Sequence, residues 1–436
     1  MLTDRNKSTY LEHFQGKTSI FAGYRVGALA KSSMAVMIWS GARLLAQLVW
    51  VLLLARALGA SSYGMFSGVA ALALAMSGLV GMGLGLRMYQ DAARDPTLFV
   101  QRWQQASRVL IWSGVSLAIL YVAIAYKMFD ANWSLLIAVA LSELVLAPIV
   151  AQVAFGYAAH GRMGHAAAAP VVLSIARIVA VIILLLLPWR VGINVYAWLH
   201  VAATGTTAVI LRLRCGQRLK IVHAKSSLNW RDARSGLGFS AVQASSLALS
   251  SMDKAFALRW GGDALAGHYV AAYRFVSTAA LPVDSLMMAA LPHLFRAGTE
   301  RRSTDRMLIM LAAATGGYGV IMGALVWCGA GLVPWLLGPS FHEASSAVRM
   351  LAVYVPLYCI RTLGTNILLG FGWKRWRFFC EITALVVMAG CAAWRIPVAG
   401  LAGAVEALLA GEIILVMLVW VGCFGALRLK YGEPHE

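Results

Sequence analysis

Residues 33–55 read SMAVMIWSGARLLAQLVWVLLLA and contain one charged side chain, Arg43. About 20 consecutive apolar residues are enough for an α-helix to cross a bilayer, so this stretch predicts a transmembrane helix. A charge at the bilayer centre costs about 2.5–3.5 kcal/mol on insertion scales, and such residues usually face the interior of a helix bundle or a water-filled cavity. Arg43 therefore predicts that this helix borders a polar space inside the protein.

Eleven further stretches have the same apolar character, which makes twelve candidate spans. The whole chain is 60% hydrophobic and only 13% charged, whereas a soluble domain averages about 25% charged residues. We therefore expect an all-α integral membrane protein with about 12 transmembrane helices. The other candidate spans are 64–86, 107–128, 133–157, 166–188, 192–211, 236–258, 265–290, 307–329, 344–371, 378–394 and 398–427.

Positive charge alternates between successive loops. The formal net charge is +19, and 26 of the 37 Lys and Arg residues lie in the two terminal tails and in every second loop. The intervening loops hold only five, which is the asymmetry of the positive-inside rule. It predicts a multi-pass membrane protein whose two termini are both cytoplasmic; the membrane is expected to be a bacterial inner membrane, as the family resemblance described below implies. It also argues against nucleic acid as the partner of the basic residues.

The chain divides into two similar halves of six spans. An arginine and two glycines that follow the first span recur 203 residues later, after the seventh span. Parallel repeats of this kind are typical of transporters that bind cargo between two lobes. The repeated positions are Arg56, Gly59 and Gly64, matched by Arg259, Gly262 and Gly267. The predicted organisation is a cytoplasmic tail (1–31), an N-terminal lobe (32–211), a basic linker (212–235), a C-terminal lobe (236–427) and a cytoplasmic tail (428–436).

Three more arginines interrupt predicted spans, namely Arg177, Arg274 and Arg361. Together with Arg43 they predict a shared cationic cavity, and Lys254 adjoins it. Helical spacing places polar residues on the same faces. These predicted lining residues are Ser40, Gln47, Gln243, Ser246, Ser250 and Tyr358. The alternative is that each arginine is bound to a buried acid, for which Glu143, Asp253, Asp284, Glu381, Glu406 and Glu412 are available.

Arginine indicates an anionic cargo, because its planar guanidinium binds phosphate and carboxylate oxygens in pairs and keeps its charge. A lipid pyrophosphate or an acidic sugar fits this chemistry. Asp253 or Glu143 is a candidate for carrying a coupling ion. The six cysteines lack metal-ligand spacing, and we find no nucleotide or hydrolase motif, so no cofactor, no metal and no catalytic residue is expected.

Four segments resemble the polysaccharide transporter branch of the multidrug/oligosaccharidyl-lipid/polysaccharide exporter superfamily. They are LARALGASSYGMFS (54–67), DKAFALR (253–259), AGHYVAAYRFV (266–276) and LLGPSF (336–341). The resemblance implies two six-helix lobes and translocation of an undecaprenyl-pyrophosphate-linked oligosaccharide, such as an O-antigen or exopolysaccharide repeat unit, by alternating access. It also implies a cationic lobe interface formed by Arg43, Arg87, Lys254 and Arg274. The lipid II flippases of the superfamily have two further helices that hold the lipid tail, and with twelve predicted spans we do not expect that groove here.

The expected function is thus a lipid-linked oligosaccharide flippase and not an enzyme. Its expected partners are the lipid-linked cargo, membrane lipids and a glycan polymerase or glycosyltransferase. A multidrug/cation antiporter would favour an acidic cavity. A membrane glycan polymerase or ligase would need a sizeable external loop, and a major facilitator would need its signature loop after the second span.

Overall fold

The computed structural model describes residues 21–187, 192–221, 236–297 and 304–432, and they form helices without any strand. The first group of helices comprises α2 (Phe21–Ser77), α3 (Leu84–Arg94), α4 (Phe99–Met128), α5 (Trp133–Ala140), α6 (Ala147–Ala159), α7 (Met163–Leu186) and α8 (Ile193–Arg218). We call this group the N-terminal half. The C-terminal half comprises α10 (Leu237–Ala297), α11 (Thr304–Gly329), α12 (Leu332–Leu337), α13 (Ala344–Leu351), α14 (Tyr354–Gly370) and α15 (Lys374–Gly432).

Three very long helices each contain a glycine that reverses the chain. Gly59 in α2, Gly262 in α10 and Gly400 in α15 have φ values of 73°, 78° and 56°. Glycine adopts such backbone angles without the steric cost that a Cβ would impose. Each long helix is therefore two membrane crossings. With the other elements this gives twelve crossings in the described residues, as the sequence predicts.

Length and composition alone identify fewer crossings. Six helices are long and apolar enough to span a membrane, or seven if the bent pair α13 and α14 counts as one. Two of the six, Met34–Ser77 and Lys374–Ala426, include a reversing glycine. At 1.5 Å per residue they measure about 66 and 80 Å, roughly two or more times the 30 Å hydrocarbon thickness. They therefore account for two crossings each.

Several crossings contain local breaks that the sequence did not predict. A 3₁₀ segment, η1 (Val80–Gly83), separates α2 from α3, and its Met82 has a φ of 49°. A π-helical segment, η3 (Leu141–Leu146), joins α5 to α6. The predicted tenth span bends by 45° between α13 and α14. Pro356 lies one turn beyond this bend, and it has no N–H to donate to the Ala352 carbonyl.

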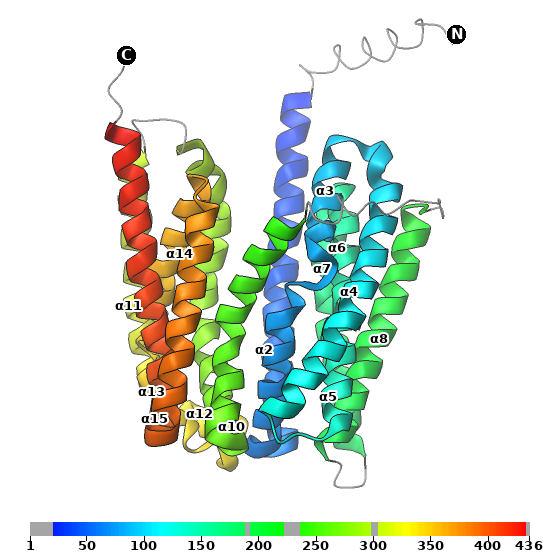
Figure 1. Ribbon diagram of the computed structural model, residues 1–436. Helices are drawn as coiled ribbons and strands as arrows, with labels where there is room; N and C mark the ends of the chain where they lie inside the picture. Colours follow the sequence, from blue (N-terminus) through cyan, green and yellow to red (C-terminus); the bar gives the residue numbers. More distant parts are fainter. Residues whose placement is uncertain (1–20, 188–191, 222–235, 298–303, 433–436) are drawn as a thin grey trace, which may run out of the picture.

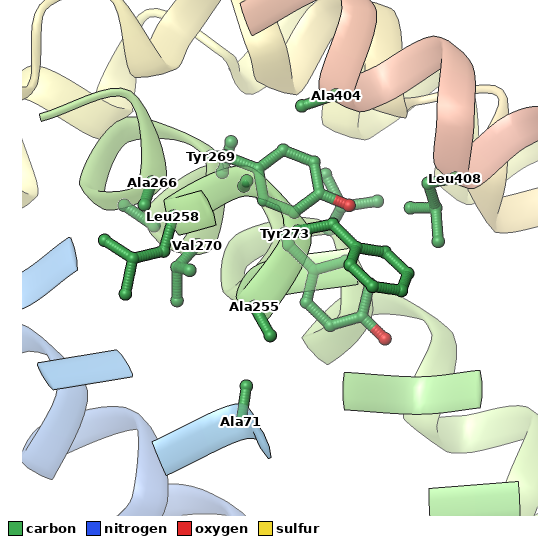
Figure 2. Packing of buried hydrophobic residues seen from close by; sticks show 14 of the residues in the cluster. Ala71, Ala255, Leu258, Ala266, Tyr269, Val270, Tyr273, Ala404 and Leu408 are labelled. Carbon is green, nitrogen blue, oxygen red and sulfur yellow. The ribbon is translucent and has the colours of Figure 1, made fainter. Parts of the chain in front are cut away.

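The two halves stand side by side, and they meet along α2 of the N-terminal half and α10 of the C-terminal half (Figure 1). These two helices form the most extensive helix contact in the molecule. Figure 2 shows part of the packing there, with Ala71 of α2 below Ala255 of α10, and the rings of Tyr269 and Tyr273 near Leu408 of α15. All five side chains are buried.

The repeated glycines of the sequence meet each other at this contact. A Cβ on Gly64 would overlap the Asp263 carbonyl oxygen, and a Cβ on Gly267 would overlap the Ala60 carbonyl oxygen. Ala60 and Asp263 are themselves 203 positions apart. The two halves therefore approach through equivalent backbone segments, as two copies of one unit related by a twofold axis would.

Several helices continue past the predicted ends of the lobes. Helix α2 begins at Phe21, α8 runs to Arg218 and α15 runs to Gly432. The residues involved include Arg and Lys, which are good helix formers and prolong a helix into the aqueous phase. The remaining parts of the predicted tails and linker (1–20, 222–235 and 433–436) lie outside the described residues.

Candidate functional site

A cavity of about 590 Å³ lies between the two halves. Helices α2, α7 and α8 and segment η3 line it from the N-terminal half, and α10, α14 and α15 line it from the C-terminal half. The residues of its wall that bear charge or hydrogen-bonding groups include Arg43, Gln47, Glu143, Arg177, His200, Ser246, Ser250, Lys254, Arg274, Tyr358, Arg361 and Glu412. Five cations and two carboxylates thus line one space.

Arg43 and Arg274 have no acidic group within 4.0 Å among the described residues. Arg43 comes from α2 and is exposed, whereas Arg274 comes from α10 and is half-buried. The Nε of Arg274 is buried without a hydrogen-bond partner. A buried donor without a partner is costly. One arginine from each half therefore presents unneutralised charge to the cavity.

Arg177 is bound to an acid. Its guanidinium donates to Glu143 over 2.6 Å, and the same carboxylate oxygen lies 2.9 Å from Nε2 of His200. The Ser142 hydroxyl also donates to it, over 3.3 Å. Glu143 is in the π-helical segment η3, and such segments are frequent at functional sites. Helices α7 and α8 and segment η3 thus hold one polar cluster against the cavity.

Arg361 has a partner in its own half. Its Nε lies 3.0 Å from a carboxylate oxygen of Glu412, and its guanidinium carbon is 4.6 Å from the centre of the Tyr358 ring. Tyr358 in turn donates to both carboxylate oxygens of Asp284 over 2.9 Å. Arg361 is therefore a neutralised part of the cavity wall.

Lys254 is the most enclosed of the five cations, with 6% of its side chain exposed. It lies 2.8 Å from Asp253, and its ammonium group is 3.5 Å from the centre of the Tyr273 ring. Asp253 also accepts a hydrogen bond from Tyr269 over 2.8 Å. Asp253 thus lies behind Lys254 and does not itself line the cavity.

Three other predicted residues lie away from this cavity. Ser40 is exposed and Arg87 lies 3.6 Å from Asp91, and neither side chain is in the cavity wall. The break at η1 redirects the chain before α3, so Arg87 does not continue the cavity-facing side of α2. Gln243 lines a neighbouring pocket of about 340 Å³, to which Glu143 also contributes.

His200 was not among the residues predicted from the sequence, yet it is 2% exposed and in contact with Glu143. The signal in the sequence was the presence of a histidine, His200, inside the predicted span 192–211. Its ring also packs edge-on against Phe66, and its Nδ1 lies 3.3 Å from the Tyr196 hydroxyl. His200 therefore belongs to the same polar cluster as Glu143 and Arg177.

The two halves contact each other at the end of the bundle where α12 lies (Figure 1). Arg56 of α2 donates to the carbonyl oxygens of Leu336 and Trp335 in α12, over 2.6 and 3.1 Å. Tyr63 of α2 packs edge-on against Phe341, with ring centres 6.1 Å apart. These contacts join the two halves at one end of the cavity, whose wall includes Tyr63.

Replacing Glu143 with alanine is expected to destabilise the protein. Removing one partner of a fully buried ion pair costs about 3–5 kcal/mol, and we expect a smaller loss here because 17% of the Arg177 side chain and 15% of the Glu143 side chain are exposed. Thermal unfolding in detergent measures this effect. Glu406→Ala is the matched control, because its pair with Arg395 is largely exposed and its loss should shift unfolding little. Equal shifts for the two variants would contradict the assignment.

Comparison with known proteins agrees with this architecture. The family described as "Polysaccharide biosynthesis protein" matches residues 29–297. No curated protein sequence is a significant match to the chain.

Solved transporter structures share the fold. An inward-facing multidrug resistance MATE family transporter of the MOP superfamily aligns with a TM-score of 0.69 and 18% identity, covering 90% of this chain and 96% of that one. An outward-facing MATE structure aligns with a TM-score of 0.56 and 19% identity, covering 94% and 96%. A MOP superfamily transporter from Pyrococcus furiosus aligns with a TM-score of 0.59 and 17% identity, covering 92% and 96%. The family match spans more than half of the sequence, and the chain therefore belongs to the polysaccharide biosynthesis protein family.

Proposed function

We propose that this protein is a flippase for a polyprenyl-pyrophosphate-linked oligosaccharide. The diphosphate and the sugars would pass through the cavity between the two halves, while the polyprenyl tail stays in the lipid. The direction would be from the cytoplasmic to the periplasmic leaflet of a bacterial inner membrane. Membership of a polysaccharide biosynthesis family supports a glycan cargo.

One observation supports this proposal most strongly. Arg43 and Arg274 come from opposite halves, line the same cavity and lack an acidic partner within 4.0 Å among the described residues. Two guanidinium groups can bind a diphosphate through paired, charge-assisted hydrogen bonds. The ligand would then link the halves, so its binding and release would be coupled to their relative movement.

The contacts between the halves at the α12 end fit a cytoplasm-facing state. Arg56 holds α2 against α12 there, at one end of the cavity. The inward-facing MATE structure is also a better match to this fold than the outward-facing one, with TM-scores of 0.69 and 0.56. We propose that the structure corresponds to the state that receives cargo from the cytoplasmic leaflet.

For the coupling ion, Glu143 is a better candidate than Asp253. Glu143 lines the cavity beside His200 and Arg177. Asp253 lies behind Lys254 and is bound by it and by Tyr269. A proton arriving from the cavity would reach Glu143 first.

A multidrug/cation antiporter is the competing function, because several structures with this fold are MATE multidrug transporters. A cationic drug needs an accessible acid in the cavity. Here the two lining carboxylates, Glu143 and Glu412, are each bound to an arginine. The Pyrococcus furiosus transporter is likewise described as having a binding pocket of reverse polarity, which suggests a different function for that protein.

Reconstitution into liposomes separates the two functions. We expect the protein to move a fluorescent polyprenyl-pyrophosphate oligosaccharide between leaflets, at a rate well above that of empty liposomes. We expect it not to move a lipophilic dye cation, even with an imposed proton or sodium gradient. Dye transport without movement of the lipid-linked glycan would refute the proposal.

A further inference from the structure

The charges along the cavity between the halves can be counted pair by pair. Three of the five cations each lie close to a carboxylate of their own. The pairs are Arg177 with Glu143 (2.6 Å), Arg361 with Glu412 (3.0 Å) and Lys254 with Asp253 (2.8 Å). Arg43 and Arg274 have no acidic partner within 4.0 Å among the described residues. With histidine counted as neutral, the described wall therefore has a net charge of +2, and these two arginines supply it.

Other carboxylates of the chain do not raise this count. Asp284 lies behind Tyr358, whose hydroxyl donates to both of its oxygens over 2.9 Å, and any negative charge there lowers the positive potential of the cavity. The acid-containing segments outside the described residues are at least eleven residues along the chain, or about 16 Å of helix, from any residue of the wall. Two is therefore the largest number of negative charges that the described wall can balance.

A lipid-linked diphosphate accounts for both of these charges. It is esterified at one end to the lipid and at the other to a sugar, so it keeps one acidic oxygen on each phosphorus and is a dianion at neutral pH. Arginine binds phosphate oxygens through two parallel N–H groups, and Arg43 and Arg274 each provide one such fork. When the diphosphate is bound, no unneutralised cation of the described wall is left for an acidic group on the sugars.

Beyond Arg43, the cavity-facing side of α2 is polar but uncharged. Gln47 and Trp50 follow Arg43 at one and two turns, and all three residues line the cavity. The helix rises about 10 Å from Arg43 to Trp50, toward the α12 end. The Gln47 amide can donate to sugar hydroxyls and accept from them. The Trp50 indole is held by a hydrogen bond of 2.9 Å to the Tyr196 hydroxyl. These side chains suit a glycan that bears hydroxyl groups and no charge.

We infer that the oligosaccharide of the cargo is uncharged and that the diphosphate carries all of the cargo's negative charge, an inference that rests on the proposed flippase function. The substrate class is thereby narrowed to lipid-linked glycans without uronic or other acidic sugars. A carboxylate on the glycan would enter the cavity without a cation to pair with. Burying an unpaired charge is costly, so an acidic glycan should be transported at least about tenfold more slowly than a neutral one.

Three cargoes on one polyprenyl diphosphate test this specificity in liposomes that contain the purified full chain. One cargo ends in glucose, the second in glucuronic acid and the third in the methyl ester of glucuronic acid, which removes the charge of the second. We expect the glucose and ester cargoes to move at similar rates, and the acid at least about tenfold more slowly. The ester separates the effect of charge from the effect of size.

A variant with an added cation should widen the specificity. Gln47→Arg places a third guanidinium one turn from Arg43 and should raise the rate of the acidic cargo, relative to the glucose cargo, about tenfold, as a charge-assisted hydrogen bond would. Ser40→Arg is the matched control, because it adds the same group on the same helix at an exposed position outside the cavity wall. It should keep the wild-type ratio of rates.

Equal wild-type rates for the glucose and glucuronic acid cargoes would overturn the inference, and so would an ester cargo that is as slow as the acid. A Gln47→Arg variant that moves the glucose cargo normally but keeps the wild-type ratio would also overturn it. The wild-type ratio decides the question even if this variant is unstable. If the wild type moves none of the three cargoes, the flippase function itself is refuted, which is a distinct result.

Discussion

Replacing both Arg43 and Arg274 with alanine is expected to reduce glycan export at least about a hundredfold while leaving the protein folded. A hydrogen bond to a charged group contributes about 1.5–3 kcal/mol, so losing two such groups from one ligand costs at least about 3 kcal/mol. Neither arginine forms an ion pair within 4.0 Å in the described structure, so no buried acid is left without its partner. Surface glycan in cells that lack their own flippase gene measures the effect, and lipid-linked precursor should accumulate in the cytoplasmic leaflet.

Arg349→Ala is the control for this experiment. Arg349 also lies in a predicted span, but it is exposed and does not line the cavity. Its replacement should leave export close to the wild-type level. Lysine at positions 43 and 274 should restore part of the activity, because it keeps the charge but cannot bind phosphate with two parallel N–H groups. Normal export by the double alanine variant would remove both residues from the proposed site.

Replacing Gly64 and Gly267 with alanine adds only two methyl groups, yet it is expected to abolish glycan export. A Cβ at either position would overlap a backbone carbonyl of the opposite half. Backbone atoms cannot turn aside as a flexible side chain can, so α2 and α10 would have to separate. The contacts of Arg56 with α12 lie near this crossing and would be weakened with it. We expect loss of export, and labelling of a cysteine at position 63 by an impermeant thiol reagent from outside the cell.

Gly41→Ala is the matched control on the same long helix. A Cβ at Gly41 would have no atom within 4 Å, and its φ is not in the left-handed region. It should therefore leave export and labelling unchanged. If Gly64→Ala/Gly267→Ala exports glycan normally and the cysteine at position 63 is not labelled, the close approach of the two halves is not needed for the transport cycle.

The sequence predicted the twelve crossings because each depends on local composition. Apolar length identifies a span, and the charge of the loops orients it. The repeated glycines also predicted a structural equivalence, since Gly59 and Gly262 adopt nearly the same backbone angles. Breaks such as η1 and η3 were not predictable, because packing and hydrogen bonding with other helices decide them.

The partners of the intramembrane charges could not be predicted either. Helical periodicity shows which residues share a face, but not which distant residue that face meets. Glu143 and Arg177 are 34 positions apart, and Arg361 and Glu412 are 51 apart. The alternative of an acid partner therefore applies to two of the four arginines, and an anion-binding role for the other two stays a prediction. Arg177 and Arg361 are bound to acids, whereas Arg43 and Arg274 are not.

The central claim is that Arg43 and Arg274 bind one diphosphate in a shared cavity. A double-mutant cycle on affinity tests it most directly, with a short-chain polyprenyl-pyrophosphate sugar and the Arg43→Ala, Arg274→Ala and double variants measured by calorimetry. We predict that each single variant weakens binding more than about tenfold and that the double variant weakens it at least about a hundredfold, but by less than the product of the two single effects, because both groups contact the same ligand. Unchanged affinity in both single variants would contradict the account.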